Sequence, residues 1–347
     1  MTYPTAAVTT TNLDASGDSP ALARSDILDG IQKLNQMIAH TTAFAATLLD
    51  DIDAGTARGT LVAAKSGGNT DITSLGAVAS INGGQLAGLR NRIINGNFGV
   101  NQRAYTSGGV VGANLYGHDR WKMAASGDTY TFSTTANVTT VTIPSGKVLQ
   151  QVIEGLNLET GTYTLSWVGT AQGKIGAGSY GASGITGAIT GGTNITIEFG
   201  PGTVSKVQLE FGSVATAFEQ RPYGMELALC QRYYYRLKAT AGGDFIAMGY
   251  KAGTTSLYVS GIFPVKMRAT PTLETSGVAT DYSCGGWEPG DYKGGQCTSI
   301  PANVGAQSAE RWSLAFSYSF AGFTVGLGGE AIFTSGVNGY LGWRAEL

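Results

Sequence analysis

The sequence predicts a mainly β protein in which an N-terminal helix is followed by two antiparallel β-sandwich modules. Its 347 residues include 52 Gly and 16 Tyr, while only 13% of them are charged. Such a composition is typical of short strands and tight turns rather than of a helical enzyme. A chain of this length can hold two or three domains.

The charge balance argues against several classes of partner. Lys and Arg number 22, against 24 Asp and Glu, so no basic field is present to attract nucleic acid or a membrane surface. The N-terminal stretch lacks the cationic start and apolar core of a signal peptide, and no apolar run is long enough to cross a bilayer. We therefore expect neither nucleic-acid binding nor membrane insertion.

The N-terminal region predicts an arm followed by a coiled-coil helix. Residues 1–19 are polar and Thr-rich without periodicity, which is typical of an extended or disordered arm. Ser19 and Pro20 form a helix start, and Gly55 ends the helix expected over residues 20–54. Apolar residues spaced by three and four positions predict an oligomerisation seam. The seam consists of Ile27, Ile31, Leu34, Ile38, Leu48 and Ile52.

An amphipathic helix lying on its own domain is the alternative to the coiled coil. We prefer the coiled coil, because a linker rather than a core follows the helix. Residues 55–90 are low in charge and dense in Gly, Ala, Ser and Thr. Alone they cannot bury enough surface to fold, so they form a flexible linker or a shaft ordered by other copies.

Residues 91–222 predict the first β-sandwich. Asn95-Gly96 is a strong turn signal, and Trp121 and Trp167 lie in strand patterns and are expected in the core. Many short strands at regular spacing are typical of an antiparallel sandwich. The expected strands span residues 130–133, 138–143, 147–152, 161–168, 194–199 and 205–211, and residues 171–194 are expected to be a glycine-rich loop or a pair of flat strands.

A junction joins this module to a second β-module, predicted over residues 223–347. Pro222 disfavours a helix immediately before itself, and a short helix-favouring run starts at Met225. Tyr233, Tyr234 and Tyr235 are expected to pack this junction. The strands expected beyond it span residues 245–250, 256–263, 313–320, 323–325, 330–333 and 339–345.

Several phrases of the chain resemble bacteriophage tail-fibre and related virion adhesin proteins. They are KVQLEFGSVATAFEQRPYGMELALCQRYY at 206–234, IINGNF at 93–98 with NQR and DRW after it, TARGTLVAAKSGGNTDITSLGAV at 56–78, GIFPVKMRATPTL at 261–273 and YLGWRAEL at 340–347. The resemblance implies a jelly-roll-like first module, a shaft of three wrapped chains and a C-terminal tip domain. It also implies attachment to other tail or head proteins through the N-terminus.

The packing rule and the resemblance disagree about the number of chains. Ile at one seam position with Leu at the other favours two strands, whereas fibres of this kind are trimers. We expect a homotrimer, because Thr41 and Ala45 weaken the seam and the β-modules would set the symmetry.

The sequence contains no pattern that predicts catalysis, a cofactor or a metal. Gly176–Gly181 spells GxGxxG, but it lacks the flanking strand and helix that a dinucleotide site needs. The two histidines, His40 and His118, carry no catalytic pattern. Cys230, Cys284 and Cys297 form no CxxC, and either free thiols or a Cys284–Cys297 pair fits the spacing. We expect no enzyme, no cofactor and no metal site.

The best candidate surface is the stretch DYSCGGWEPGDYKGGQC at residues 281–297, which is expected to be a glycine-rich loop. Exposed aromatic rings stack against sugar faces, and carboxylates accept bonds from sugar hydroxyls. The same residues could instead fill a hydrophobic cluster or a subunit interface. The candidate glycan-binding residues are Trp287, Tyr292, Tyr282, Glu288 and Asp291.

These observations and the resemblance predict a receptor-binding fibre protein of the virion that attaches to a host-surface glycan or protein. One alternative is a tailspike-like polysaccharide depolymerase, which needs two carboxylates facing each other across a glycosidic bond. The other is a purely structural virion component, such as a head decoration fibre or a tail connector.

Overall fold

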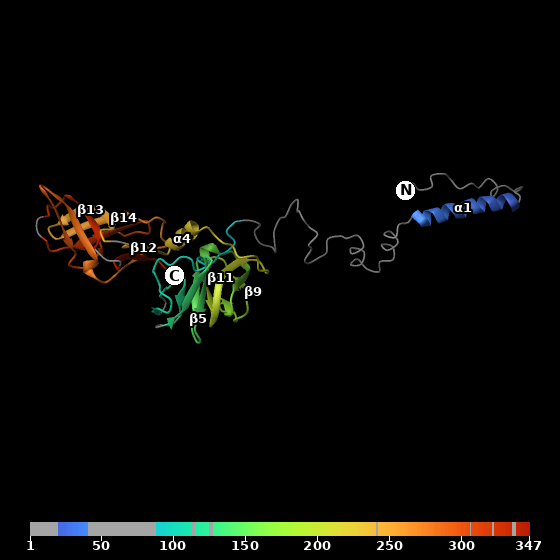
Figure 1. Cartoon of the computed structure of the whole chain (residues 1–347), viewed down its shortest axis with the longest axis horizontal. Coiled ribbons are helices and arrows are strands. Elements are labelled where there is room, and N and C mark those ends of the chain that lie inside the picture. The colour runs from blue at the N-terminus through green and yellow to red at the C-terminus, as the bar shows by residue number, and fades with distance from the viewer. Residues whose placement is uncertain are drawn as a thin grey trace. The chain divides into compact units, whose positions relative to one another are not determined.

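The computed structural model describes residues 20–40 and 88–347, except 113–114, 125–127, 241, 306, 321–322 and 335–337. The chain divides into two units, Met1–Val78 and Ala79–Leu347 (Figure 1). The protein is mainly β, with 44% strand and 11% helix, as the composition predicts. No helix among the described residues is long and apolar enough to span a membrane.

The first unit contains helix α1 (Pro20–His40). It begins at the predicted proline, and an ion pair of 3.0 Å joins Lys33 to Asp29 one turn earlier. Three of the predicted seam residues are half exposed: Ile27 at 50%, Ile31 at 50% and Leu34 at 55%. The side chains of the other seam residues, Ile38, Leu48 and Ile52, are not among those described, and the arm over 1–19 and the predicted shaft up to residue 87 lie outside the described residues. The coiled coil and the trimer therefore stay predictions.

The second unit opens with a sandwich-like pair of antiparallel sheets, here called the first module. One sheet has the order β2 (Lys122–Met123), β6 (Leu149–Ile153), β10 (Ile195–Phe199), β8 (Gly173–Ile175). The other has the order β4 (Thr131–Thr135), β5 (Val138–Ile143), β11 (Gly202–Phe211), β7 (Gly161–Val168), β9 (Ile185–Ile189). Two short strands, β1 (Val110–Val111) and β3 (Asp128–Thr129), pair separately, and a 3-10 turn, η1, spans Gly155–Asn157.

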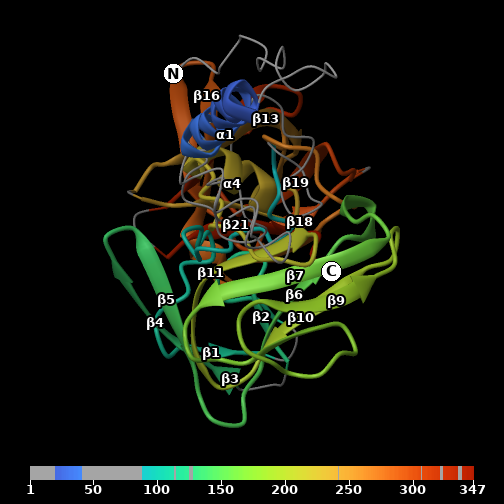
Figure 2. The same ribbon diagram turned by 90° about the vertical axis from the view of Figure 1, so that its right-hand side faces the viewer.

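From β5 to β11 the chain changes sheet at every strand, so sheet neighbours such as β5 and β11 are distant in sequence. Figure 2 shows β7 beside β9, its antiparallel partner. Strands β5 and β7 have the predicted bounds, because their alternating apolar residues face the core. Residues 171–194 contain two strands, β8 and β9, as one predicted alternative expected, but the strands lie in different sheets and do not pair with each other.

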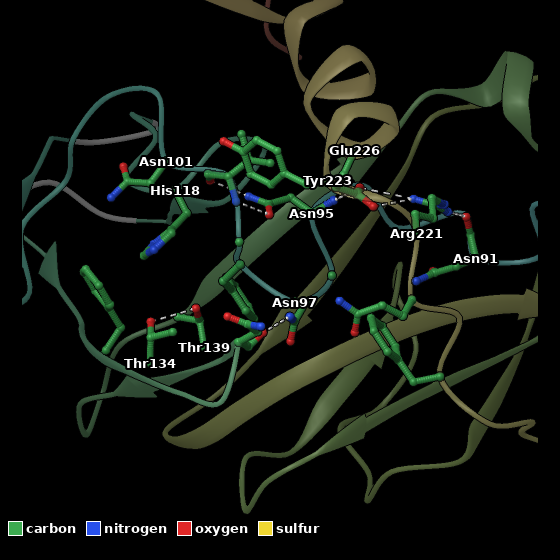
Figure 3. A pocket seen from close by; sticks show the side chains of 18 residues that line it. Asn91, Asn95, Asn97, Asn101, His118, Thr134, Thr139, Arg221, Tyr223 and Glu226 are labelled. Atoms are coloured by element: carbon green, nitrogen blue, oxygen red, sulfur yellow. Dashed lines mark hydrogen bonds and ion pairs between the residues drawn. The ribbon is translucent and has the colours of Figure 1, made fainter.

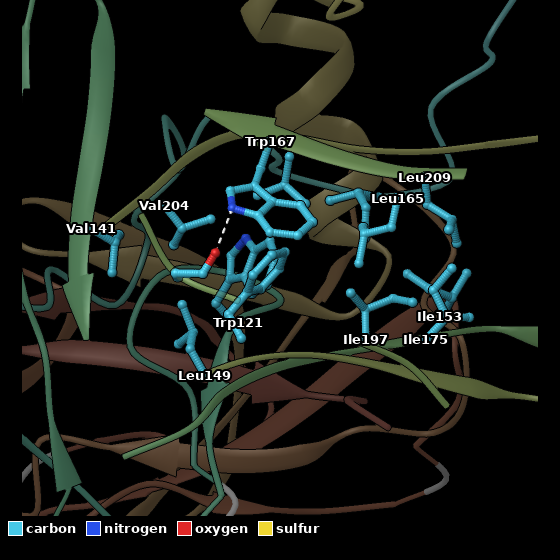
Figure 4. Packing of buried hydrophobic residues seen from close by; sticks show 14 of the residues in the cluster. Trp121, Val141, Leu149, Ile153, Leu165, Trp167, Ile175, Ile197, Val204 and Leu209 are labelled. Carbon is cyan, nitrogen blue, oxygen red and sulfur yellow. Dashed lines mark hydrogen bonds between the residues drawn. The ribbon is translucent and has the colours of Figure 1, made fainter. Parts of the chain in front are cut away.

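The core of the first module lies between its two sheets and is centred on two tryptophans (Figure 4). Trp121 is fully buried, and Trp167 is 5% exposed. The indole N–H of Trp121 donates to the carbonyl of Asn95 over 2.9 Å, and that of Trp167 donates to the carbonyl of Ala171 over 3.0 Å. Each ring thus buries its area without leaving its polar atom unpaired, and the predicted core positions are confirmed.

A short helix, α4 (Tyr223–Gln231), follows Pro222 and leads into β12 (Tyr234–Lys238). Tyr233 and Tyr234 are 1% exposed, and the ring of Tyr235 packs on Trp343 at 5.7 Å. The predicted helix is confirmed, and Tyr233 and Tyr234 pack the junction as predicted, whereas Tyr235 packs on Trp343 and Phe263 inside the second module.

The second module, residues 234–345, is built from two further antiparallel sheets. The smaller has the order β12, β21 (Tyr340–Arg344), β15 (Thr272–Thr275). The larger has the order β17 (Asp291–Gln296), β16 (Tyr282–Glu288), β20 (Gly328–Phe333), β13 (Phe245–Gly253), β14 (Ser256–Ile262), β19 (Arg311–Ser317), β18 (Ala302–Asn303), and a 3-10 turn, η2, spans Ala279–Asp281. All of these sheets are open.

Two predictions for this module are wrong. Residues 323–325 form no strand, because the chain turns there and the Leu327 N–H donates to the carbonyl of Thr324 over 3.3 Å; the Phe323 ring packs against Tyr318 and Phe320, with centroids 4.8 Å apart. Residues 281–297 are not a loop, since most of them belong to the paired strands β16 and β17. Their glycines hide the alternation of side chains on which strand prediction depends.

Candidate functional site

The predicted candidate surface is a β-hairpin at the edge of the seven-stranded sheet. Strands β16 and β17 are joined by Pro289 and Gly290, and Gly290 has a φ of 93°. Proline at the first central position and a left-handed glycine at the second are typical of a type II turn. The register sets Trp287 opposite Tyr292 and Glu288 opposite Asp291. The hairpin therefore holds Trp287 and Tyr292 directly opposite each other on neighbouring strands.

Trp287 and Tyr292 project from the outer face of this hairpin. Trp287 is 75% exposed and Tyr292 is 40% exposed. Their ring centroids lie 5.7 Å apart with an interplanar angle of 74°, an edge-to-face pair. A single exposed apolar side chain needs no explanation, but adjacent exposed aromatic rings form a contiguous apolar surface of the kind found at binding sites.

The row of aromatic side chains continues across the sheet. Gly285 pairs with Glu330, and the same register continued by two residues places Trp287 opposite Gly328. Gly328 pairs with Tyr250, and Tyr250 pairs with Tyr258. Tyr250 is 54% exposed, and its ring lies 5.8 Å from that of Tyr258. We call Tyr292, Trp287, Tyr250 and Tyr258 the aromatic row.

Gly328 leaves a gap in the middle of the aromatic row. A Cβ added there would meet no atom within 4 Å. Neighbouring strands lie about 4.8 Å apart, so Trp287 and Tyr250, two strands apart, stand about 10 Å apart across this gap. The result is two aromatic pairs that flank an open, flat floor.

Tyr292 is held in place by its hydroxyl group and by a close backbone approach. The hydroxyl donates to Glu330 over 2.8 Å. A Cβ on Gly285 would lie 1.8 Å from that hydroxyl oxygen, so only glycine leaves room for the ring. Burial, with help from the Glu330 carboxylate, raises the pKa of Tyr292 to about 12, so it is a neutral donor at neutral pH.

Glu288 lies beneath the hairpin rather than on its outer face. It is 8% exposed and forms an ion pair with Lys251, which is fully buried. The Lys251 ammonium also donates to the carbonyl of Trp287 over 3.4 Å, and the Thr324 amide donates to Glu288 over 3.1 Å. The hydrogen bond from Lys251 lowers the pKa of Glu288 to about 2. This charged pair fixes the hairpin, and Glu288 is not open to a ligand.

The remaining two predicted residues have contrasting positions. Asp291 is exposed and pairs with Lys293 over 2.8 Å, which lowers its pKa. Tyr282 is fully buried, and its hydroxyl donates to the carbonyl of Tyr340 over 2.6 Å. Tyr282 is therefore a core residue and cannot stack against a ligand at the surface. The hairpin brings Trp287 and Tyr292 together on its outer face. Asp291 alternates with Tyr292 along β17 and pairs with Glu288, so it lies on the opposite face of the hairpin.

The cysteines lie on the inner side of the second module and at the junction. All three are buried and free, and the sulfur atoms of Cys284 and Cys297 are 3.4 Å apart. Their mutual hydrogen bond, together with burial, raises the pKa of Cys284. Within the described residues, no group of three His, Cys, Asp or Glu side chains could hold a metal ion.

A groove that the sequence analysis did not predict as a site lies in the first module (Figure 3). It has a volume of about 520 Å³. Three phrases that stood out in the sequence line it: IINGNF through Asn95 to Phe98, GHDRW through His118, and RPYG through Arg221 and Tyr223. Asparagine-rich turns beside aromatic residues were the available signal, but nothing in the sequence showed that the phrases meet.

Comparison with known proteins finds no protein-family model and no curated protein that matches this chain. The functional assignment depends on the residues and the geometry described above.

Proposed function

We propose that this chain is a receptor-binding fibre protein of a bacteriophage particle, which attaches the virion to a host-surface glycan. The observation that carries the proposal is the aromatic row on the outer face of the seven-stranded sheet. The phrases that resemble tail-fibre proteins support the viral setting, and the mainly β fold is compatible with it.

A linear glycan fits the chemistry and dimensions of the row. Trp287 and Tyr250 offer ring faces on which the C–H face of a sugar can stack. Glu330, whose carboxylate contacts the Tyr292 hydroxyl, lies beside the row and can accept hydrogen bonds from sugar hydroxyls. The gap of about 10 Å between the two aromatic pairs suits a chain of sugar units that crosses the strands over Gly328. Because the hairpin is anchored by Lys251, little ordering of the protein is needed on binding.

The remaining parts would present this surface in several copies. In this proposal, residues 1–19 and the coiled coil over 20–54 attach to other tail or head proteins, and residues 55–90 form a shaft of three wrapped chains. A jelly-roll-like module over 91–222 and a tip over 223–347 project outward. Three linked copies would raise the effective concentration of individually weak sites, so that the trimer binds a cell surface far more tightly than one chain.

The carboxylates of Glu288 and Asp291 favour a protein that binds the glycan without cleaving it. A glycosidase needs an acid whose pKa is raised, beside a second free carboxylate. Near the hairpin the pKa values of Glu288 and Asp291 are both lowered by lysine partners. Glu288 and Asp291 are therefore poorly suited to act as the general acid of a depolymerase.

The proposal is tested on an array of bacterial surface polysaccharides probed with the fluorescently labelled full chain. The wild-type chain should bind at least one polysaccharide, and Trp287→Ala should abolish that binding. Gly328→Val should weaken it as strongly, because the new side chain points into open space and fills the gap. Release of new reducing ends from the bound polysaccharide would instead identify a depolymerase.

Tyr180→Ala is the matched control for Tyr292→Ala. Tyr180 is 39% exposed and its hydroxyl donates to Glu198 over 3.0 Å, so it resembles Tyr292 in exposure and bonding but lies in the first module. We expect Tyr292→Ala to weaken binding and Tyr180→Ala to leave it unchanged. Equal binding by the wild type, Trp287→Ala and Gly328→Val would show that the aromatic row does not bind the polysaccharide.

A further inference from the structure

The groove in the first module is lined by four separate stretches of the chain, within residues 91–101, at His118, within residues 132–139 and within residues 218–226 (Figure 3). The loop 95–101 runs between the β4–β5 hairpin on one side and residues 218–226, which enter α4, on the other. The groove has a volume of about 520 Å³, which falls within the ~300–1,000 Å³ typical of small-molecule sites. It is separate from the aromatic row, which belongs to the second module.

The charged groups in the wall of this groove are already engaged with each other. Arg221 pairs with Glu226 over 3.2 Å and donates to the carbonyl of Ile93 over 3.0 Å. Glu226 also accepts the backbone N–H of Asn95. Burial lowers the pKa of His118 to about 4, so its ring is uncharged at neutral pH. The groove therefore offers a ligand no free charge of either sign.

The groups left over at the groove are amides, hydroxyls and aromatic rings. The side-chain oxygen of Asn97 is buried and has no hydrogen-bond partner among the described residues, while its amide N–H donates to the carbonyl of Asn137 over 2.7 Å. Asn137 and Gln220 are exposed at the rim. Tyr223 is 63% exposed. Such groups both donate and accept, as a sugar hydroxyl does.

The backbone around the groove is held in an unusual conformation. Asn95, Phe98 and Asn137 have φ values of 59°, 52° and 62°, in the left-handed region. This conformation is uncommon for residues other than glycine and is a clear outlier for a bulky one such as Phe98. Strain of this kind gathers at binding sites, where it holds side chains in a set geometry.

We propose that the groove binds a neutral, hydroxyl-rich ligand of one or two sugar units. Amides and hydroxyls at the rim would bond the sugar hydroxyls, and the Tyr223 ring would stack on a sugar face. Charged ligands are disfavoured, because entering the groove would strip their hydration without supplying a counter-charge. The inference does not depend on the proposed function, since a groove site can exist whether or not the aromatic row binds glycan.

The test is calorimetric titration of the full chain with free glucose, galactose, mannose, rhamnose and N-acetylglucosamine, and with inorganic phosphate as the charged probe. At least one neutral sugar should bind. Two variants address the groove: Tyr223→Ala, and Asn137→Gly, which keeps the left-handed turn while removing the amide. Each should weaken binding about 5- to 10-fold, the effect of losing one neutral hydrogen bond or one stacking contact.

Two control variants separate the sites. Tyr180→Ala removes an exposed tyrosine elsewhere in the first module, and Trp287→Ala disables the aromatic row; both should bind the free sugar as the wild type does. Failure of every neutral sugar to bind, or binding of phosphate alone, would overturn the proposal. So would sugar binding that survives both groove variants and is lost in Trp287→Ala, since that result would assign the sugar to the row.

Discussion

The Glu346 carboxylate pairs with the guanidinium of Arg120, a residue of the first module that is 1% exposed. A second arginine of that module, Arg103, reaches the same carboxylate over 3.2 Å. The two guanidinium groups stack on Tyr233 and Tyr234, 3.6 Å and 3.5 Å from the ring centroids. The residues just after β21 therefore join the two modules through a buried charge cluster.

Removing this carboxylate should cost much more stability than removing an exposed one. Glu346→Ala leaves the buried Arg120 without its acidic partner, and breaking a buried pair in this way destabilises by about 3–5 kcal/mol. Urea unfolding of the full chain measures the loss. Glu274→Ala is the control, because Glu274 and its partner Arg344 are 29% and 34% exposed at their side chains and such pairs contribute about 0–1 kcal/mol. Equal losses in the two variants would contradict the account.

The neighbouring residues His118 and Asp119 make opposite contributions to the pH dependence of stability. Burial lowers the pKa of His118 from 6.5 to about 4, so below pH 6.5 the unfolded state binds more protons and stability falls as the pH drops. Burial raises the pKa of Asp119 from 3.8 to about 6, against the effect of Arg103, so its contribution falls as the pH rises through that range. The two effects partly cancel between pH 4 and 6.

Asp119→Asn should uncover the histidine contribution. The free energy of unfolding should then rise more steeply between pH 4 and 6.5 than it does in the wild type, as urea titrations at several pH values would show. An unchanged or shallower slope would mean that Asp119 is ionised throughout this range.

The two close cysteines predict a specific oxidation product. Because their sulfur atoms are only 3.4 Å apart, exchange with glutathione disulfide should form a Cys284–Cys297 disulfide and release two reduced glutathione molecules. Mass spectrometry should show a loss of two hydrogens, and peptide mapping should leave Cys230 as the free thiol. Stable glutathione adducts on Cys284 or Cys297 would show that the two sulfurs cannot reach bonding geometry.

Ile27, Ile31 and Leu34 form a half-exposed apolar stripe on α1. We expect a charged residue placed in this stripe to prevent the chains from forming the predicted trimer. The full chain should sediment at three times the 35.8 kDa mass of one chain, and Ile31→Asp should shift it toward a single chain. Gln32→Asp places the same charge on an exposed, non-seam position of the same helix and should have no effect. A wild-type chain that sediments as one copy would contradict the trimer.

Regular alternation of apolar residues made part of this fold predictable. Strands β5 and β7 begin and end as predicted, because every second side chain enters the core. The β16–β17 hairpin was missed as a hairpin, because Gly285, Gly286 and Gly294 carry no side chain to alternate. Trp287 and Tyr292 were predictable as candidates from composition alone.

Other parts of the site depend on contacts that no local pattern contains. Lys251 would be expected to face solvent from its strand, but it is buried because Glu288, distant in sequence, neutralises it. Placing Trp287 and Tyr250 at one level needs the register of three strands, β16, β20 and β13, which no local pattern contains. The groove likewise forms only when four separate segments are brought together.

The most direct test of the central claim is the fluorescence of Trp287 during titration with the polysaccharide that the array identifies. The difference in emission between the wild type and Trp287→Phe isolates this residue from the other four tryptophans. If a sugar stacks on the indole and excludes water from it, that difference spectrum should shift to shorter wavelength and saturate with binding. Saturable binding with an unchanged difference spectrum would contradict the account, because the glycan would then be held somewhere other than the aromatic row.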